Sequence, residues 1–184
     1  MAVFRKLLPA EAGRYRDHLL RLSQADRRAR FFGSMSDDAI RNYVDRISWS
    51  RTIVLAAIQR GEVRAAAELR LGDRPGEAAE LAFSVEQELQ GQGVGTILTR
   101  RILTAARNRC VRRVYMICQS DNRRMQRIAS KLIGLCRFED GDVISTKDLP
   151  PATALSVAQE FIDTGAVPMA TMLDQWQRPE SAAA

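Results

Sequence analysis

The stretch from Leu89 to Leu98, LQGQGVGTIL, constrains the fold more than any other part of the chain. Three glycines alternate with Gln92 and Val94, and the apolar residues that follow recur at helical spacing. Glycine adopts positive φ and leaves backbone open where other residues place a side chain, but it costs conformational entropy. We therefore expect a turn between a strand and a helix whose backbone closely approaches another group.

The segments on both sides of this turn predict an α/β fold with a mixed sheet. TIVLAAI and EVRAAAELRL are strand-like runs separated by Gln59, Arg60 and Gly61, a hairpin signal, and AAELAFSV follows the turn DRPGE. Strands joined by such short turns are antiparallel neighbours. After the glycines come a helical stripe and a further apolar run at 114–118, so strands 78–85 and 114–118 should be parallel.

The rest of the chain predicts further elements and a C-terminal extension. We expect a first strand at Val3–Leu7, a helix over Pro9–Leu22, a helix capped by Ser36, a helix in NRRMQRIASKLIGL, and a hairpin turning at Asp140-Gly141. Pro150-Pro151 ends this unit. We therefore divide the chain into a domain at 1–149 and a helical extension with a tail at 150–184, whose helices are TALSVAQEFIDTG and PMATMLDQW.

Composition excludes several classes of protein. The chain has 184 residues, of which 46% are hydrophobic and 27% charged, as in ordinary globular proteins. No run approaches the roughly 18 to 20 apolar residues of a membrane span, and the N-terminus lacks the apolar region of a secretory signal. Three cysteines without CxxC spacing predict neither a disulfide framework nor a metal site. We expect a cytoplasmic protein with no membrane partner.

Positive charge is concentrated in one block of the sequence. The net charge is +6, and the segment from Arg100 to Arg137 holds eleven Arg or Lys and one acid, Asp121. Such a block could face nucleic acid, a small polyanion, or solvent on two helix faces. Aromatic residues are not interleaved with these arginines, which argues against stacking on single-stranded nucleic acid. We do not expect a nucleic-acid partner.

Three phosphate-binding patterns can be compared with the glycine-rich stretch. A Walker loop requires Gly-Lys-Ser/Thr, whereas Gly95 is followed by Thr96 and Ile97. A dinucleotide fingerprint requires glycine where Thr96 stands and an acid about 20 residues later. Gln90-Gly91-Gln92-Gly93-Val94-Gly95 instead matches Q/R-x-x-G-x-G/A, and in this motif the chain resembles the GNAT superfamily of acyl-CoA-dependent N-acyltransferases.

The resemblance covers roughly residues 1 to 149. AELAFSVEQELQGQGVGTIL is similar to the family's fourth strand, turn and third helix, and VYMICQSDNRRMQRIASKL to its fifth strand and Asn-led helix. RLSQADRRARFFGSMSDDAI resembles the paired helices of bacterial protein lysine acetyltransferases. The fold implied is GNAT-like: a mixed, mostly antiparallel sheet with a central, splayed parallel strand pair and flanking helices.

The resemblance implies transfer of an acetyl group from acetyl-CoA to a primary amine, on a small molecule or a protein lysine, by direct attack. Backbone N–H groups of the turn would bind the pyrophosphate, with Gly93 and Gly95 leaving room for it. Part of the Arg100–Arg113 cluster would meet the 3′-phosphate. The pantetheine arm would pair near Phe83, and the N–H of Val85 would polarise the thioester carbonyl. The expected CoA-binding residues are Phe83, Ser84, Val85, Gln90, Gly91, Gln92, Gly93, Val94, Gly95, Thr96 and Asn122.

Proton transfer is the less complete part of the resemblance. Glu80 falls on the family's general base, and Glu68 on the preceding strand is the reserve. Many GNAT enzymes have a proton-donating tyrosine seven residues after the asparagine, where this chain has Ala129. Either the thiolate leaves unaided, or Ser120, Tyr115 or Cys118 substitutes, or the chain is a regulatory acyl-CoA-binding domain with little turnover. His18, the only histidine, is expected to be satisfied or exposed, and a homodimer through the extension stays open.

Overall fold

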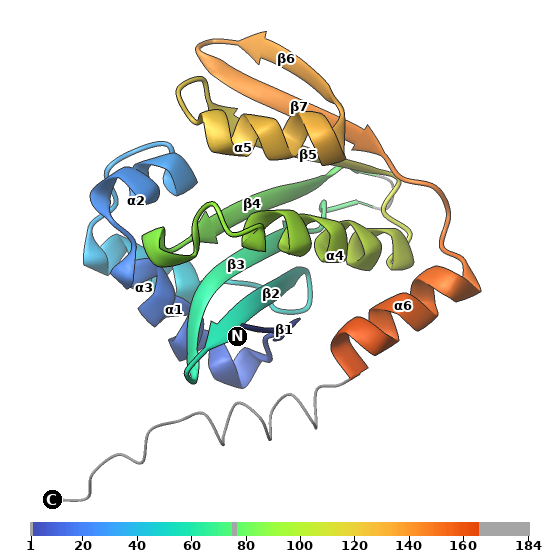
Figure 1. The fold of residues 1–184 in the computed structure, drawn as a ribbon, viewed down its shortest axis with the longest axis horizontal. Helices are drawn as coiled ribbons and strands as arrows, with labels where there is room; N and C mark the ends of the chain where they lie inside the picture. The colour runs from blue at the N-terminus through green and yellow to red at the C-terminus, as the bar shows by residue number, and fades with distance from the viewer. Residues whose placement is uncertain (1, 75–76, 166–184) are drawn as a thin grey trace, which may run out of the picture.

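A seven-stranded sheet in the order β1-β2-β3-β4-β5-β7-β6 runs through the computed structural model (Figure 1). The structure describes residues 2–74 and 77–165. All neighbouring strands are antiparallel except β4 and β5, so the predicted mixed sheet with one parallel pair is confirmed. The strands are β1 (Val3–Lys6), β2 (Thr52–Gln59), β3 (Glu62–Arg70), β4 (Ala79–Val85), β5 (Arg113–Gln119), β6 (Leu135–Glu139) and β7 (Asp142–Asp148).

The two predicted hairpins form for local reasons. Arg60 and Gly61 have φ of 53° and 78°, and Asp140 and Gly141 have φ of 50° and 86°. Positive φ at both central residues is the geometry of tight turns whose twist matches antiparallel strands. The turns therefore place β2 against β3 and β6 against β7, as the sequence predicts.

Helices cover both faces of the sheet. One face carries α4 (Val94–Asn108), with α5 (Arg123–Ile128) over β5 and β7, and the opposite face carries the N-terminal helices (Figure 1). Ser23 and Ser36 cap two of these helices by accepting hydrogen bonds from the backbone N–H groups three residues on. The N-terminal helices are α1 (Ala12–Arg21), α2 (Gln24–Phe31) and α3 (Asp37–Asp45).

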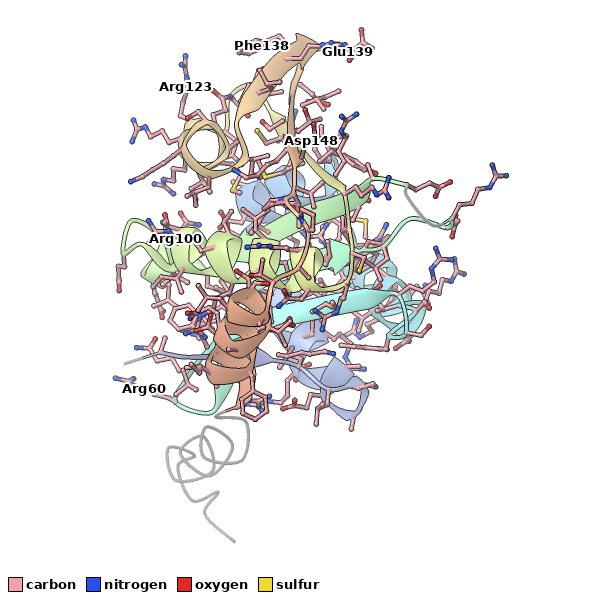
Figure 2. All side chains as sticks on the ribbon, turned by 90° about the vertical axis from the view of Figure 1, so that its right-hand side faces the viewer. Arg60, Arg100, Arg123, Phe138, Glu139 and Asp148 are labelled. Carbon is pink, nitrogen blue, oxygen red and sulfur yellow. The ribbon has the colours of Figure 1, made fainter. Side chains whose placement is uncertain are left out.

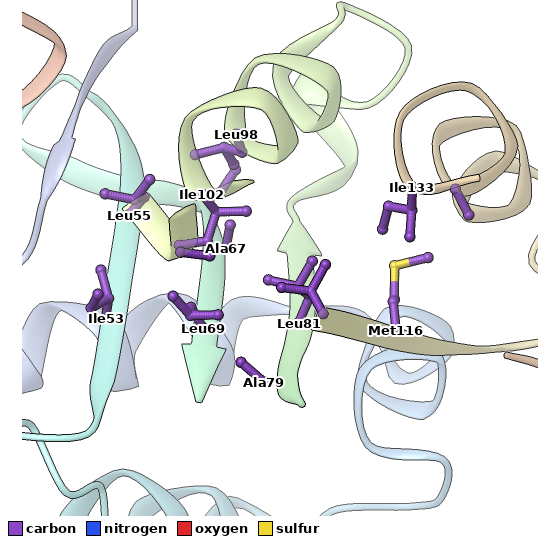
Figure 3. Packing of buried hydrophobic residues seen from close by; sticks show 14 of the residues in the cluster. Ile53, Leu55, Ala67, Leu69, Ala79, Leu81, Leu98, Ile102, Met116 and Ile133 are labelled. Atoms are coloured by element: carbon purple, nitrogen blue, oxygen red, sulfur yellow. The ribbon is translucent and has the colours of Figure 1, made fainter. Parts of the chain in front are cut away.

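Two hydrophobic clusters lie on the two faces because β2 is apolar at every position from Ile53 to Ile58. Leu55 packs with Leu98 and Ile102 of α4 (Figure 3), whereas the neighbouring Val54 belongs to the cluster with Tyr15 and the other apolar residues of α1 and α3. A strand buried on both sides reads as a continuous apolar run. The sheet is therefore fixed from both faces, and its central strands hold the site rigidly.

The helix predicted at 122–135 is not a single α-helix. It ends at Ile128 and continues as a π-helical turn, η3 (Ala129–Ile133), closed by a 2.8 Å hydrogen bond from the Gly134 N–H to the Ala129 carbonyl oxygen. Gly134 follows with φ of 112°, which favours glycine. The wider turn buries both Ala129 and Ile133 in the α4-side core.

The first helix of the predicted extension is present as α6 (Ala154–Gly165). It lies beside α4 and is held there by polar contacts, including ion pairs of Arg109 with Glu160 at 2.7 Å and of Arg101 with Asp163 at 3.3 Å. The second predicted helix, PMATMLDQW, lies outside the described residues. No helix within 2–74 and 77–165 is long and apolar enough to cross a membrane.

Candidate acyl-CoA site

The parallel strands β4 and β5 separate along their length. Only two pairs are in register, Ala79 with Val114 and Glu80 with Tyr115. Strand β4 continues to Val85, still paired with β3, and β5 continues to Gln119, paired with β7. The sheet is therefore closed at Glu80 and open beyond it.

The edge of β4 that faces this opening offers backbone N–H groups. The N–H of Glu86 donates to the carbonyl oxygen of Arg64, just beyond the end of β4, at 3.0 Å. Because N–H directions alternate along a strand, the N–H groups of Phe83 and Val85 point away from β3 and toward β5. These two donors lie beyond the last registered β4–β5 pair, so they face the opening between the strands.

The glycine-rich turn forms the start of α4. Gly91 and Gly93 have φ of 78° and 80°, and a Cβ at either position would meet no atom within 4 Å. The first hydrogen bond of the helix runs from the Ile97 N–H to the Gly93 carbonyl oxygen at 3.1 Å. Among described residues, none accepts a hydrogen bond from the N–H groups of 91–96. With a 15-residue helix behind them, these groups form an anion-binding cradle.

Gly95 lies in close contact with α5. A Cβ on Gly95 would lie 2.9 Å from Cδ1 of Ile128 on α5, so this methyl group would have to shift. That the missing side chain at Gly95 also leaves room for phosphate stays a prediction.

The glutamine side chains of the motif hold the turn in place. Nε2 of Gln90 donates to Oδ1 of Asp26 on α2 and to the carbonyl oxygen of Val85, both at 2.9 Å, while Arg124 of α5 donates to Oε1 of Gln90. Nε2 of Gln92 donates to the carbonyl oxygen of Glu88 at 2.6 Å. The turn thus offers its backbone to a ligand, and Gln90 ties together the elements on both sides of the strand opening.

A cleft of about 990 Å³ lies at the closed end of the strand opening. Glu80 and Tyr115, the last registered pair, both line it. Oε2 of Glu80 lies 3.6 Å from a guanidinium nitrogen of Arg70. The other lining residues come from α3, the segment before β2 and the segment between β3 and β4: Ala39, Asn42, Tyr43, Arg46, Ile47, Ser48, Arg51, Thr52, Leu71, Gly72, Asp73, Glu77 and Ala78.

Glu68, the reserve base, is fully engaged beneath this cleft. Its carboxylate accepts hydrogen bonds from the hydroxyls of Tyr15 and Tyr43 at 2.8 Å and pairs with Arg30 at 2.9 Å. Burial alone would raise the pKa of Glu68, but the charge of Arg30 and the two hydroxyls hold that pKa below its usual value. A buried, paired carboxylate of this kind does not suit a general base.

Asn122 and Ala129 lie on the helix beyond β5. Oδ1 of Asn122 accepts a hydrogen bond from the Met125 N–H at 3.1 Å and caps α5, so only the side-chain nitrogen is left for a ligand. Ala129 is 0% exposed and packs in the core. The position where a tyrosine is usual in related sequences is therefore part of the core packing.

The three substitutes for that tyrosine differ in their surroundings. Tyr115 lines the cleft opposite Glu80, and burial followed by the charge of Glu80 raises the pKa of its phenol. Cys118 is buried, which raises the pKa of its thiol to about 11. Ser120 lies beyond the end of β5 and is exposed. Of the three, Tyr115 alone lines the cleft.

Much of the basic block serves contacts within the chain. Arg101 and Arg109 pair with acids of α6, Arg107 donates to the carbonyl oxygen of Pro151 at 2.7 Å, and Arg113 pairs with Asp148 at 2.6 Å. Because these four arginines contact other parts of the chain, fewer members of the 100–113 cluster are left to meet a phosphate. Figure 2 shows Arg123 projecting outward from α5.

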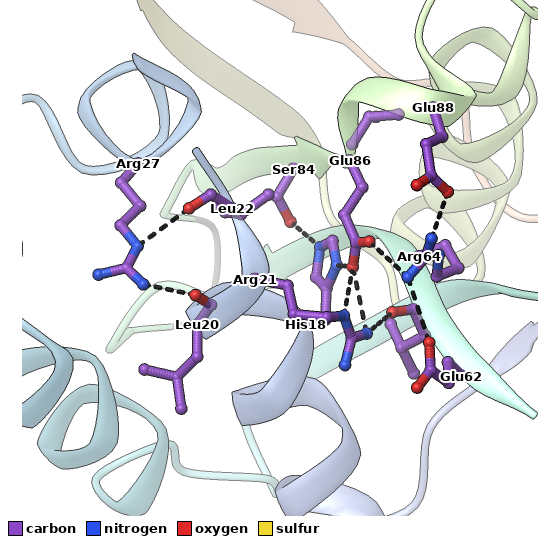
Figure 4. Close-up of polar contacts among 12 residues, drawn as sticks. His18, Leu20, Arg21, Leu22, Arg27, Glu62, Arg64, Ser84, Glu86 and Glu88 are labelled. Atoms are coloured by element: carbon purple, nitrogen blue, oxygen red, sulfur yellow. Dashed lines mark hydrogen bonds and ion pairs between the residues drawn. The ribbon is translucent and has the colours of Figure 1, made fainter. Parts of the chain in front are cut away.

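The N-terminal helices supply polar residues that the sequence did not single out. His18 is buried between Ser84 and Glu86 of the β4 region (Figure 4), and Tyr43 lines the cleft. The burial of His18 could have been predicted from its position on the helix, because it lies on the same apolar stripe as Tyr15 and Leu19. Within the described chain, no group of three His, Cys, Asp or Glu side chains could hold a metal ion.

This chain is similar in sequence to known acetyltransferases. The sequence profile of the Acetyltransferase (GNAT) family matches residues 17–135. The acetyltransferase Pat of Mycolicibacterium smegmatis is 33% identical over 86 residues, which are 46% of this chain and 26% of Pat. The chain therefore spans about a quarter of the length of that relative.

Solved structures share the fold. The GNAT domain of S. lividans PAT has a TM-score of 0.69 and 26% identity, covering 80% of this chain and 90% of that one. RimL, a ribosomal L7/L12 α-N-protein acetyltransferase solved in complex with coenzyme A, has a TM-score of 0.61 and covers 79% of this chain and 93% of its own. At 15% identity, the likeness to RimL concerns the fold alone.

Proposed function

The chain belongs to the acetyltransferase (GNAT) family, and we propose that it moves an acetyl group from acetyl-CoA to a primary amine by direct attack. The observation that carries the proposal is the pairing of a strand opening with an anion cradle. The opening between β4 and β5 has the length and the backbone donors for an extended arm, and the N–H groups of 91–96 lie at its mouth.

In this proposal the backbone binds the acyl donor. The N–H groups from Gly91 to Thr96 hold the pyrophosphate, since the helix dipole and free donors both favour anionic oxygens. The pantetheine arm pairs with β4 at Phe83 to Val85, and the amide nitrogen of Asn122 contacts it from α5. The N–H of Val85 stabilises the negative charge that develops on the thioester oxygen during attack.

Glu80 is the proposed general base, because it lines the cleft at the closed end of the opening. Its carboxylate faces the route by which an amine reaches the thioester. Val85 is five residues further along β4, roughly 16 Å at about 3.3 Å per residue. The proton therefore passes from the amine to Glu80 along a chain of several water molecules rather than directly.

Tyr115 is the proposed source of the proton for the departing thiolate, which it supplies through the same water molecules because it stands level with Glu80. It is paired with Glu80 across the parallel strands and shares the same cleft. Its raised pKa keeps the phenol protonated at neutral pH, as a donor requires. In this assignment Tyr115 takes the role of the tyrosine that many GNAT enzymes have at the position of Ala129.

A second candidate function is acyl-CoA binding without appreciable turnover. The observation that favours it is the burial of Ala129, since the usual proton donor is absent and core packing fills its place. Such a domain would bind acetyl-CoA in the same opening and report its presence to a partner. Both functions require binding of acetyl-CoA, but only the enzyme transfers the acetyl group repeatedly.

A free-thiol release assay distinguishes an N-acetyltransferase from a domain that only binds acyl-CoA. Purified protein is titrated calorimetrically with acetyl-CoA and then incubated with acetyl-CoA and a panel of amines, polyamines and lysine peptides. The enzyme assignment predicts saturable binding and continuous CoA release with at least one acceptor. Binding without multiple-turnover release from any acceptor would favour the second function, and no binding would contradict both.

A further inference from the structure

Ser84, His18 and Glu86 form a hydrogen-bonded row beside the strand opening (Figure 4). The Ser84 hydroxyl lies 2.8 Å from Nε2 of His18, and Nδ1 of His18 lies 2.9 Å from a carboxylate oxygen of Glu86. All three side chains are buried, with His18 0% and Ser84 6% exposed. A hydroxyl, an imidazole and a carboxylate in this order are the parts of an activated serine.

The partners of Glu86 fix the position of each proton. The Glu86 carboxylate also pairs with Arg21 at 3.1 Å and with Arg64 at 3.0 Å. Burial raises the pKa of Glu86, but His18 and the two arginines outweigh it and keep the carboxylate ionised. An ionised carboxylate can only accept, so Nδ1 of His18 is the donor to it.

His18 is therefore poised to accept the proton of Ser84. Burial lowers the pKa of the imidazole despite the neighbouring carboxylate, so His18 is neutral at pH 7. With its proton on Nδ1, the lone pair of Nε2 points at the Ser84 hydroxyl. The hydroxyl donates to the imidazole, which is the direction that makes the serine oxygen nucleophilic.

Ser84 lies at the place where the thioester is expected. It stands between Phe83 and Val85, whose N–H groups face the opening, and it is four residues past Glu80, where pairing with β5 ends. Alternation along β4 puts the side chains of Ser84 and Glu80 on the same face, the one from which an amine would approach.

We propose that Ser84 is a self-acylation site, which takes the acyl group of bound acyl-CoA when no amine is present. The inference rests on the proposed function only in placing acyl-CoA in the strand opening. It adds a covalent event on the protein to the direct transfer of the acyl group to an amine.

The step balances without any further reactant. Oγ of Ser84 attacks the thioester carbonyl carbon as its proton moves to Nε2 of His18, and Glu86 stabilises the imidazolium. The N–H of Val85 stabilises the oxyanion of the tetrahedral intermediate. The carbon–sulfur bond then breaks, and CoA leaves as the thiol with the proton from His18. Nothing is oxidised or reduced, and the products are an acyl ester of Ser84 and free CoA.

Burial makes this ester long-lived. Hydrolysis needs a water molecule at the ester carbonyl, yet His18 and Ser84 are almost fully enclosed. We therefore expect a burst of one CoA released per chain, followed by a much slower phase. A freely hydrolysing serine would show continuous release instead.

The test is a rapid-mixing experiment with acetyl-CoA and no amine. Released thiol is measured against time, and acid-quenched protein is digested with trypsin and analysed by mass spectrometry for an acetyl group on Ser84 in the peptide 71–100. The variants are Ser84→Ala and His18→Gln, with Ser145→Ala as matched control. Ser145 is likewise a fully buried strand serine, but its hydroxyl partner is the thiol of Cys136.

Wild type and Ser145→Ala should each release one CoA per chain in the burst and carry the acetyl group on Ser84. Ser84→Ala should lose both the burst and the acetyl group, and calorimetric titration of this variant with CoA shows whether the loss occurs with the donor bound. If His18→Gln does not fold, Ser84→Ala alone decides the matter, because it removes one oxygen. An undiminished burst in Ser84→Ala, or no burst from wild type with calorimetrically bound acetyl-CoA, would overturn self-acylation. Absence of CoA binding would instead refute the proposed function.

Discussion

Replacing Gly93 with alanine separates the conformational role of the glycine turn from its role in binding. Gly93 has φ of 80° and Gly141, in the distant β6–β7 turn, has φ of 86°. A Cβ at either residue meets no atom within 4 Å. The two positions therefore impose the same backbone strain on alanine, and only one of them belongs to the anion cradle.

The expected loss of stability is small and is the same for Gly93→Ala and Gly141→Ala. A left-handed conformation costs an L-residue about 1–2 kcal/mol. Stiffening of the unfolded chain offsets about 0.4–1 kcal/mol of this. Gly93→Ala and Gly141→Ala should therefore each lower the free energy of unfolding by about 1 kcal/mol, or Tm by about 2–4 °C. Thermal and urea unfolding without ligand measure this term.

The expected loss of CoA affinity is confined to Gly93. A methyl group above the row of N–H groups displaces a phosphate oxygen from at least one hydrogen bond, which for a charged acceptor contributes about 1.5–3 kcal/mol. The Kd for CoA should rise roughly tenfold or more in Gly93→Ala and stay at the wild-type value in Gly141→Ala. Calorimetric titration gives both values, and equal affinities for the two variants would refute the phosphate assignment.

Three further predictions follow from the contacts described. Glu80→Gln should retain CoA binding but lose amine acetylation at neutral pH and regain part of it at high pH, where the amine is already deprotonated. Glu139→Gln, an exposed glutamate, is the control. If the pH–rate profiles of the two variants were alike, Glu80 would have no part in the mechanism. Gly95→Ala brings a Cβ within 2.9 Å of Cδ1 of Ile128, so its effect on stability should be more favourable in an Ile128→Val background, which lacks that atom; equal effects in the two backgrounds of a double-mutant cycle would contradict the packing argument. Burial raises the pKa of Glu11, but hydrogen bonds from Arg5 and Leu8 outweigh it and lower that pKa from 4.5 to about 2. The stabilisation that ionised Glu11 contributes is therefore present above pH 4.5 and lost as the pH falls toward 2. Glu11→Gln should flatten the pH dependence of the free energy of unfolding between these values. An unchanged pH dependence in this range would contradict the role of Glu11.

Features set by local chemistry were predictable from the sequence. The turns at Arg60-Gly61 and Asp140-Gly141 need only residues that tolerate positive φ, and Ser36 caps its helix within one turn. The parallel pairing of β4 with β5 follows from the handedness of strand–helix–strand units. These features need no knowledge of distant contacts.

Features set by distant partners were not predictable. The π-helical turn at Ala129 buries that residue in the core, and the close approach of Gly95 to Ile128 depends on how α4 packs on the next helix. His18 meets residues 66 and 68 positions away, which no spacing rule connects. Glu68 could be named from the sequence as a reserve base, but no pattern could show that Arg30 and two tyrosines engage its carboxylate.

The central claim is that acyl-CoA lies between β4 and β5 with its pyrophosphate on the start of α4. Backbone amide NMR on ¹⁵N-labelled protein, titrated with CoA, tests it most directly. The amide signals of Gly91, Gly93 and Gly95, with those of Phe83 and Val85, should shift together and saturate at one equivalent of CoA. Saturable shifts that leave these five amides unmoved and appear elsewhere on the protein would contradict the claim.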